Sequence, residues 1–173
     1  MRSVPLSVRG FAVVVGVVLG WGLAASPALA GTADPYLDAI APDSTVVITD
    51  AAAMLGAPDG RYATVQGQFG RQLVVDLGAG EEGVGDLEVA YVNPPGTLSQ
   101  QLWVDFLDGN GRKVGEGYLL MIGTSARTAV VSNSATQSYR YLRMVTEVRT
   151  YRFDSMKTAA LASSMVGAHH ARP

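Results

Sequence analysis

Hydrophobic and polar residues alternate along several short stretches of the chain. In residues 102–107 the apolar side chains of Leu102, Val104 and Phe106 occupy every second position. A period of two is typical of a strand with one buried face, so we expect these three residues to share the core side of a sheet. Seven further stretches show the same alternation or are rich in β-branched and aromatic residues: 45–49, 72–77, 87–92, 117–122, 128–131, 139–148 and 150–156.

Clusters of Gly, Pro, Asn, Asp and Ser separate these stretches. About eight short strands with turns between them predict an all-β fold, an antiparallel β-sandwich. No segment after the N-terminal region sustains a period of 3.6 residues, and residues 51–55 are expected to form one helical turn at most. We therefore assign residues 45–158 to the sandwich, 31–44 to an N-terminal arm or linker, and 159–173 to a flexible tail.

The first 30 residues have the pattern of a secretory signal peptide. Arg2 and Arg9 precede an apolar run that covers residues 11–19. Ala28 and Ala30 have the small side chains that signal peptidase requires before its cleavage site. A membrane anchor is the alternative, but glycines interrupt the run and it is short for a span of ~20 apolar residues. We therefore expect cleavage after Ala30 and a secreted or periplasmic protein with no remaining membrane span.

Charge and cysteine content limit the partners of the mature chain. Removing 30 of 173 residues leaves 11 Lys and Arg against 15 Asp and Glu, a net charge of −4, with no basic block. Nucleic acid is therefore not an expected partner, because phosphate neutralisation needs clustered positive charge. The chain has no cysteine, so no disulfide stabilises it, and stability must come from the core or from a bound ion.

One motif suggests a nucleotide site. Gly78, Gly80 and Gly83 have the spacing G-x-G-x-x-G of dinucleotide-binding loops. Such a site needs a helix that begins at the glycines, since the N–H groups of that helix hold the pyrophosphate. Here a strand pattern follows, and Glu81 and Glu82 would repel the phosphates. We therefore expect a glycine-rich loop between two strands and no nucleotide cofactor.

The sequence offers few groups for catalysis. Its only histidines, His169 and His170, lie in the predicted tail. A Ser-His-Asp arrangement would therefore lack its base within the fold, and a zinc site of His and Cys would lack its ligands. We expect a protein that is not an enzyme, with a hydrolase as the weakest of the alternatives.

Five short motifs, in order, resemble a known family. The chain has LGAPDG at residues 55–60, LVVDLG at 73–78, VDFLDG at 104–109, YRYLRM at 139–144 and TYRFDS at 150–155. Their succession resembles galactose-binding-like jelly-roll domains, the discoidin-type and carbohydrate-binding-module sandwiches of bacterial exported proteins. The resemblance covers about residues 45–158 and implies a jelly roll. The chain departs from the family pattern at Val65 and Gln66, where an aromatic residue is usual, and this bears on the sugar-contacting surface.

The resemblance also implies a structural calcium ion. By position, Asp59 matches the acid of the family's Asp-Gly loop, Thr64 a following oxygen ligand, and Asp154 an acid near the last strand. Oxygen ligands of this kind suit calcium, which would tie the two distant segments together. The alternative is that Pro58, Asp59 and Gly60 form a simple turn without an ion.

Glycans or cell-surface carbohydrates are the ligands that the resemblance implies. Arg61 and Tyr62 beside the Asp59 loop, and Tyr139 and Arg140 near Asn133, are the candidate contacts. The alternative is that Tyr62 and Tyr141 pack in the core or at strand edges. The resulting hypothesis is a secreted, non-catalytic binding module. The alternative is a structural or protein-interaction domain of the cell envelope that binds no sugar.

Overall fold

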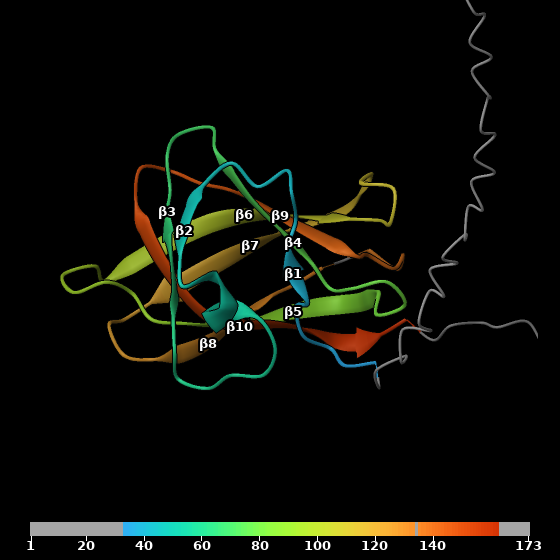
Figure 1. Ribbon diagram of the computed structural model, residues 1–173, viewed down its shortest axis with the longest axis horizontal. Coiled ribbons are helices and arrows are strands. Elements are labelled where there is room, and N and C mark those ends of the chain that lie inside the picture. The colour runs from blue at the N-terminus through green and yellow to red at the C-terminus, as the bar shows by residue number, and fades with distance from the viewer. Residues whose placement is uncertain (1–32, 134, 163–173) are drawn as a thin grey trace, which may run out of the picture. The chain divides into compact units, whose positions relative to one another are not determined.

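The computed structural model describes residues 33–133 and 135–162, which form two antiparallel sheets packed face to face (Figure 1). The predicted signal peptide and the two tail histidines lie outside the described residues. In the part described, no helix is long and apolar enough to cross a membrane. The predicted antiparallel β-sandwich is confirmed.

Each sheet has five strands. The first, called here the β6 sheet, has the order β1 (Ala39–Ile40), β4 (Gln72–Asp76), β9 (Tyr141–Val145), β6 (Ser99–Leu107) and β7 (Lys113–Ile122). The second, called here the β10 sheet, has the order β2 (Val47–Thr49), β3 (Ala63–Gln66), β10 (Thr150–Leu161), β5 (Gly83–Tyr91) and β8 (Arg127–Val131).

Strand β6 shows why the alternating pattern leads to this fold. Leu102, Val104 and Phe106 are buried, as expected, and face the core between the sheets. Trp103 and Asp105 consequently point to the outer face of the β6 sheet, because successive side chains of a strand lie on opposite sides. One strand thus supplies both the core and the outer surface.

Two short strands do not stand out in the sequence. β1 lies in the segment expected to be an arm or linker, where Leu37 is 1% exposed and the Asp38 N–H donates to the Asp76 carbonyl at 3.0 Å. β3 has four residues, and Ala63 and Val65 are its only buried apolar side chains. Two apolar positions are too few to establish a period. The expected helical turn is present as a 3-10 helix, η1 (Ala51–Met54).

The G-x-G-x-x-G segment is a loop that leads into a strand. β5 begins at Gly83 and pairs antiparallel with β10, so no helix starts at these glycines. Gly78 and Gly80 have φ angles of 110° and 87°, which favour glycine. A Cβ on Gly83 would come within 2.9 Å of the Tyr139 ring, so this glycine is needed for close packing. The segment is therefore a glycine-rich loop between two strands, as expected, and Gly83 in addition permits close packing in the core.

Candidate functional site

The outer face of the β6 sheet gathers aromatic and charged side chains in neighbouring rows. Trp103 on β6 pairs with Tyr118 on β7 and with Val145 on β9. The next row along β6 is Asp105, which pairs with Arg143 on β9. Cross-strand partners share one face of a sheet, so these side chains form a continuous surface.

The aromatic row is open to solvent. Trp103 is 59% exposed and Tyr118 is 37% exposed. Their rings meet edge to face, with centroids 5.1 Å apart and an interplanar angle of 69°. This is a favoured aromatic geometry, so the pair holds its arrangement without covering the indole.

The charged row is organised around Asp105. Its carboxylate contacts Lys113 Nζ at 2.7 Å and Arg143 Nη2 at 2.7 Å. Burial raises the pKa of Asp105, but the hydrogen bonds from Lys113 and Arg143 outweigh it and hold that pKa below its ordinary value. Asp105 is therefore a fixed negative group, and it orients the Arg143 side chain on the surface.

A third row contains Tyr141. This residue pairs with Leu107 on β6 and with Asp76 on β4. Arg140 donates two hydrogen bonds to Asp76, Nε to Oδ1 at 2.7 Å and Nη2 to Oδ2 at 2.8 Å, and its guanidinium lies 5.0 Å from the centroid of the Tyr141 ring. The predicted ligand residue Arg140 is thus engaged within the protein, where it supports the Tyr141 ring.

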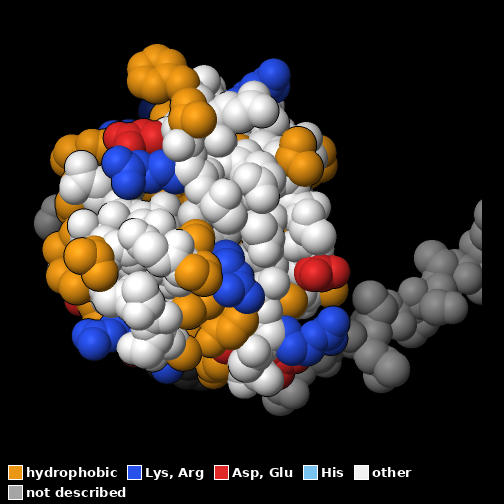
Figure 2. Space-filling view, turned by 90° about the vertical axis from the view of Figure 1, so that its left-hand side faces the viewer, with side chains coloured by type: hydrophobic (Ala, Val, Ile, Leu, Met, Phe, Trp, Pro, Cys, Tyr) orange, Lys and Arg blue, Asp and Glu red, His pale blue; other side chains and the backbone are white. Residues whose placement is uncertain are grey.

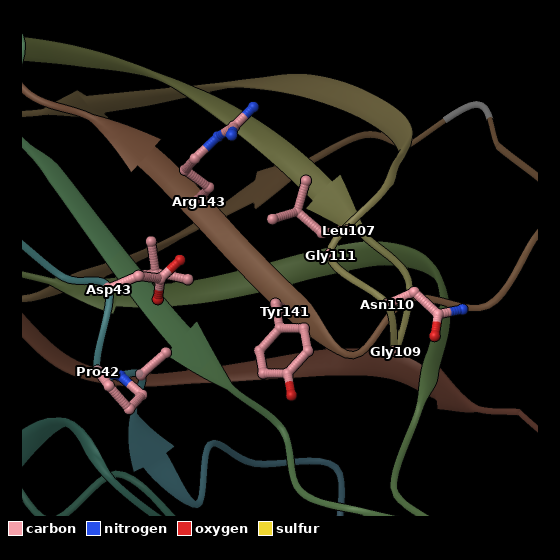
Figure 3. A pocket seen from close by; sticks show the side chains of 10 residues that line it. Pro42, Asp43, Leu107, Gly109, Asn110, Gly111, Tyr141 and Arg143 are labelled. Atoms are coloured by element: carbon pink, nitrogen blue, oxygen red, sulfur yellow. The ribbon is translucent and has the colours of Figure 1, made fainter.

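A hollow of about 430 Å³ lies over Tyr141 at this end of the face. Figure 3 shows Tyr141 between Pro42 and Asp43 of the N-terminal segment and Asn110 of the β6–β7 turn, with Arg143 toward the other end. Carboxylate, amide, phenol and guanidinium groups therefore converge on one cavity from three segments of the chain. Such a mixture of a ring with a few polar groups is typical of small-ligand sites.

The structure separates the other predicted ligand residues from this face. Tyr139 is fully buried, and its ring packs edge to face on Phe106 with centroids 4.7 Å apart. Its hydroxyl donates to Thr158 Oγ1 at 2.9 Å, and burial raises its pKa to about 12. Asn133 is 7% exposed and accepts the Ala135 N–H. The expectation of an exposed Tyr139 is therefore wrong, because its ring fills the core.

Arg61 and Tyr62 lie on the other side of the sandwich. Tyr62 lines a separate hollow on the β10 sheet, and the Arg152 guanidinium lies 5.2 Å from the centroid of its ring. Arg61 is exposed in the loop before β3. These two residues consequently do not join Arg140, Tyr139 and Asn133 in one site.

Two of the predicted calcium ligands, Asp59 and Asp154, lie close together, and hydrogen bonds join the backbone of the Asp59 loop to the Asp154 carboxylate. Asp154 Oδ1 accepts the Asp59 N–H at 3.0 Å and Oδ2 accepts the Gly60 N–H at 3.2 Å. Thr64 pairs with Arg152 inside the β10 sheet. Each oxygen of the Asp154 carboxylate therefore accepts one backbone N–H from the Asp59 loop. Among the residues described, no three His, Cys, Asp or Glu side chains form a metal-binding group. Calcium at Asp59, Thr64 and Asp154 stays a prediction.

Comparisons with known proteins concern the fold. No protein-family model matches the sequence, and no curated protein is similar to it. A solved family 29 carbohydrate-binding module aligns with 72% of this chain and 97% of its own, at 11% identity and a TM-score of 0.45. The chain is structurally similar to carbohydrate-binding modules of the β-sandwich type.

Two larger proteins align with this chain over part of their length. One is a glycoside hydrolase family 43 arabinoxylan arabinofuranohydrolase from Bacillus subtilis, with 21% identity, a TM-score of 0.42, and 65% of this chain and 24% of that chain covered. The other is a Podospora anserina GH26-CBM35 β-(1,4)-mannanase, with 15% identity, a TM-score of 0.47, and 75% and 29% covered. This chain therefore spans less than a third of either enzyme's length.

Three surface residues of the β6 sheet were not predicted as ligand contacts. Trp103, Asp105 and Arg143 all lie between apolar positions of period-two stretches. These three side chains lie on the outer face of β6 and β9. The polar side of the alternation was the available signal: a tryptophan opposite a buried face must be exposed.

Proposed function

We propose that this protein is a non-catalytic binding module that holds carbohydrate on the outer face of the β6 sheet. The observation that carries the proposal is the exposed Trp103, flanked by Tyr118 and by the ion-paired Asp105 and Arg143. A sugar ring presents an apolar face of C–H groups and an edge of hydroxyls. An aromatic ring beside fixed charged groups offers a partner to each of these surfaces.

The length of the face favours a chain of sugars over a single one. Trp103 and Leu107 are four residues apart on one strand, which corresponds to about 13 Å. Tyr141 lies beside Leu107, so the aromatic groups stand at both ends of this interval, with the charged row between them. One pyranose ring cannot contact both ends. We therefore infer an oligosaccharide that runs along the strands from Trp103 toward the Tyr141 hollow.

The charges on this face favour a neutral glycan. Asp105 is matched by Lys113 and Arg143, and Asp76 is matched by Arg140. These five charged groups thus have their partners within the protein, and they offer hydrogen bonds to a ligand without a large net charge. The leader pattern adds the proposal that the module acts after export, in the periplasm or outside the cell.

A protein-interaction role is the second candidate, and one observation favours it. Leu98 is 77% exposed, Ile122 is 50% exposed and Leu120 is 44% exposed, all near the Trp103 end of the β6 sheet. Figure 2 shows hydrophobic side chains exposed among Lys and Arg on the side of the molecule that it views. An apolar cluster of this kind suits a protein surface as well as a glycan.

Binding to soluble neutral polysaccharides separates these candidates. We expect wild-type protein to be retarded in gels that contain xylan, mannan or a soluble cellulose derivative, and Trp103→Ala to weaken the affinity at least about tenfold, as for truncation of a central aromatic contact. Val130→Ala is the matched control, since Val130 is 55% exposed on the opposite sheet. Absence of binding to every glycan, or equal binding by Trp103→Ala, would contradict the proposal.

A further inference from the structure

A trough crosses the outer face of the β10 sheet, on the side opposite to Trp103. Its floor is a row of small side chains from three adjacent strands, because Ala90 on β5 pairs with Ser155 on β10 and with Thr128 on β8. Two neighbouring hollows of about 250 and 170 Å³ share Pro58, Ala90 and Thr128 in their walls. The small residues therefore leave an extended depression in the middle of the sheet.

Two aromatic side chains rise beside this floor. Tyr62 lines the larger hollow and Tyr36 lines the smaller one. Both are half-buried, so each ring has one side against the protein and another open to a ligand. The Arg152 guanidinium lies 5.2 Å from the centroid of the Tyr62 ring, which holds the ring and a positive charge together.

The trough carries cations that no carboxylate pairs with. Arg127 lines the larger hollow, and in residues 33–133 and 135–162 neither Arg127 nor Arg152 takes part in an ion pair. Asp154 also lines this hollow, but it is 6% exposed and both its oxygens accept backbone N–H groups.

The remaining charged groups near the trough are Lys157, Glu88 and Asp59. Lys157 and Glu88 in the smaller hollow are paired with each other at 3.0 Å. Asp59 is exposed in the adjoining loop and accepts the Arg61 N–H at 2.8 Å. Arg127 at the wall of the larger hollow and Arg152 beside the Tyr62 ring thus have no ion-pair partner among the described residues, and an arginine of this kind can receive an anionic group.

We propose that this trough is a second binding site and takes an acidic polysaccharide, with a sugar carboxylate at Arg127 and the sugar ring against Tyr62. Arginine presents a planar pair of donors that matches a carboxylate in a bidentate arrangement. The small side chains of Ala90 and Thr128 leave room for a sugar ring, which larger side chains at these positions would exclude. The site is separate from the proposed neutral-glycan face, since the two lie on opposite sheets.

Affinity electrophoresis on polygalacturonate and on a neutral polysaccharide tests the proposal. We expect the wild type to bind polygalacturonate, more weakly as salt rises, and Arg127→Glu to weaken that affinity at least about tenfold, since a charge-assisted contact becomes a repulsion. Tyr62→Ala should weaken it as well. Arg112→Glu is the matched control, because Arg112 is exposed in the β6–β7 turn, outside the trough.

The outcomes distinguish the two sites. Trp103→Ala should leave polygalacturonate binding unchanged, and Arg127→Glu should leave neutral-glycan binding unchanged. If polygalacturonate does not bind, or if Arg127→Glu and Arg112→Glu reduce its binding equally, the trough is not a site for acidic polysaccharide. Equal competition by inorganic phosphate at the same ionic strength would also overturn the proposal, because it would show anion attraction without recognition of a sugar. Melting curves confirm that each variant is folded.

Discussion

Asp154 illustrates how one buried carboxylate can organise a loop. Its two oxygens accept the N–H groups of Asp59 and Gly60, which lie almost a hundred residues earlier in the chain. Because Asp154 is 6% exposed, water cannot easily replace the hydrogen bonds between its carboxylate and these amides. The connection between the Asp59 loop and the last strand, expected through an ion, is present through hydrogen bonds.

We predict that Asp154→Asn lowers the free energy of unfolding by about 1–3 kcal/mol, the cost of leaving a buried donor unpaired. An asparagine has one acceptor oxygen, and its NH₂ group would face one of the two amide donors. Urea titration measures the change. Asp59→Asn is the control and should cost less, since Asp59 is exposed. An equal loss in both variants would count against this role of Asp154.

Calcium bound by Asp59, Thr64 and Asp154 leads to a different expectation. A chelator would then lower the melting temperature, and Asp59→Ala would remove that sensitivity, because the ion binds the native state alone. The hydrogen bonds on Asp154 favour a melting temperature that responds to neither chelator nor added calcium. Differential scanning calorimetry with EDTA and with calcium decides between the two, and a rise of several degrees with calcium would favour the ion.

The residues of the candidate site were only partly predictable. The exposure of Trp103 could be predicted from the alternating pattern, because Leu102, Val104 and Phe106 mark the buried face of β6 and Trp103 lies between them. The burial of Tyr139 could not be inferred, since a tyrosine suits the core and the surface equally and the decision depends on Phe106 and Thr158, distant in sequence. Convergence of Asp43, Asn110 and Tyr141 on one hollow likewise depends on strand order.

At the scale of elements, the long strands and the short β2 were predictable, whereas β1 and β3 were not. β5, β6 and β7 have nine or ten residues each, enough to show a period or a β-rich composition. β1 and β3 have two and four residues, and they become strands because β4 and β10 offer them backbone partners. Partners of this kind are a property of the tertiary structure and are absent from local sequence.

The loop between β4 and β5 holds an electrostatic conflict. Glu81 Oε2 is shielded from solvent and has no hydrogen-bond partner in the described structure. Burial, followed by the charge of Asp38 and then those of Asp34 and Glu82, raises the pKa of Glu81 above its ordinary value. A raised carboxyl pKa favours the folded state when the group is protonated, so at neutral pH this carboxylate opposes folding.

We predict that Glu81→Gln raises the melting temperature at pH 7, because it removes the negative charge that Asp38 repels. The gain should shrink as pH falls through the raised pKa of Glu81, where the wild-type side chain also becomes neutral. Thermal melts at pH 7 and about pH 4 measure the difference. Glu116→Gln serves as the control, since Glu116 contacts Lys113 and its loss should not stabilise. A lower melting temperature for Glu81→Gln would contradict the claim that the Glu81 carboxylate destabilises the folded state at pH 7.

For the whole molecule, acid stability depends on the ion pairs of the β6 sheet. Burial raises the pKa of Asp76 and of Asp105, but hydrogen bonds from Arg140, and from Lys113 and Arg143, leave both pKa values below the ordinary 3.8. A depressed carboxyl pKa contributes stability that is fully present above the unfolded-state value. That contribution is lost as pH falls through the lower folded-state value.

We predict that stability declines as pH falls below the ordinary carboxyl pKa of 3.8, and that Asp76→Asn with Asp105→Asn flattens this decline while lowering stability at pH 7. Both carboxylates are partly exposed, so high salt should reduce the difference between the variant and the wild type. Urea titrations over this pH range provide the measurement. An unchanged acid slope in the double variant would assign the decline to other groups.

The last strand has a consequence for how the chain reaches this fold. β10 lies in the middle of its sheet, between β3 and β5, so without it β2–β3 and β5–β8 would be two separate pairs. During synthesis the ribosome therefore releases nearly the whole domain before that sheet can be completed. The two halves of this sheet can therefore join only late, after strands that are far apart in sequence have all been made.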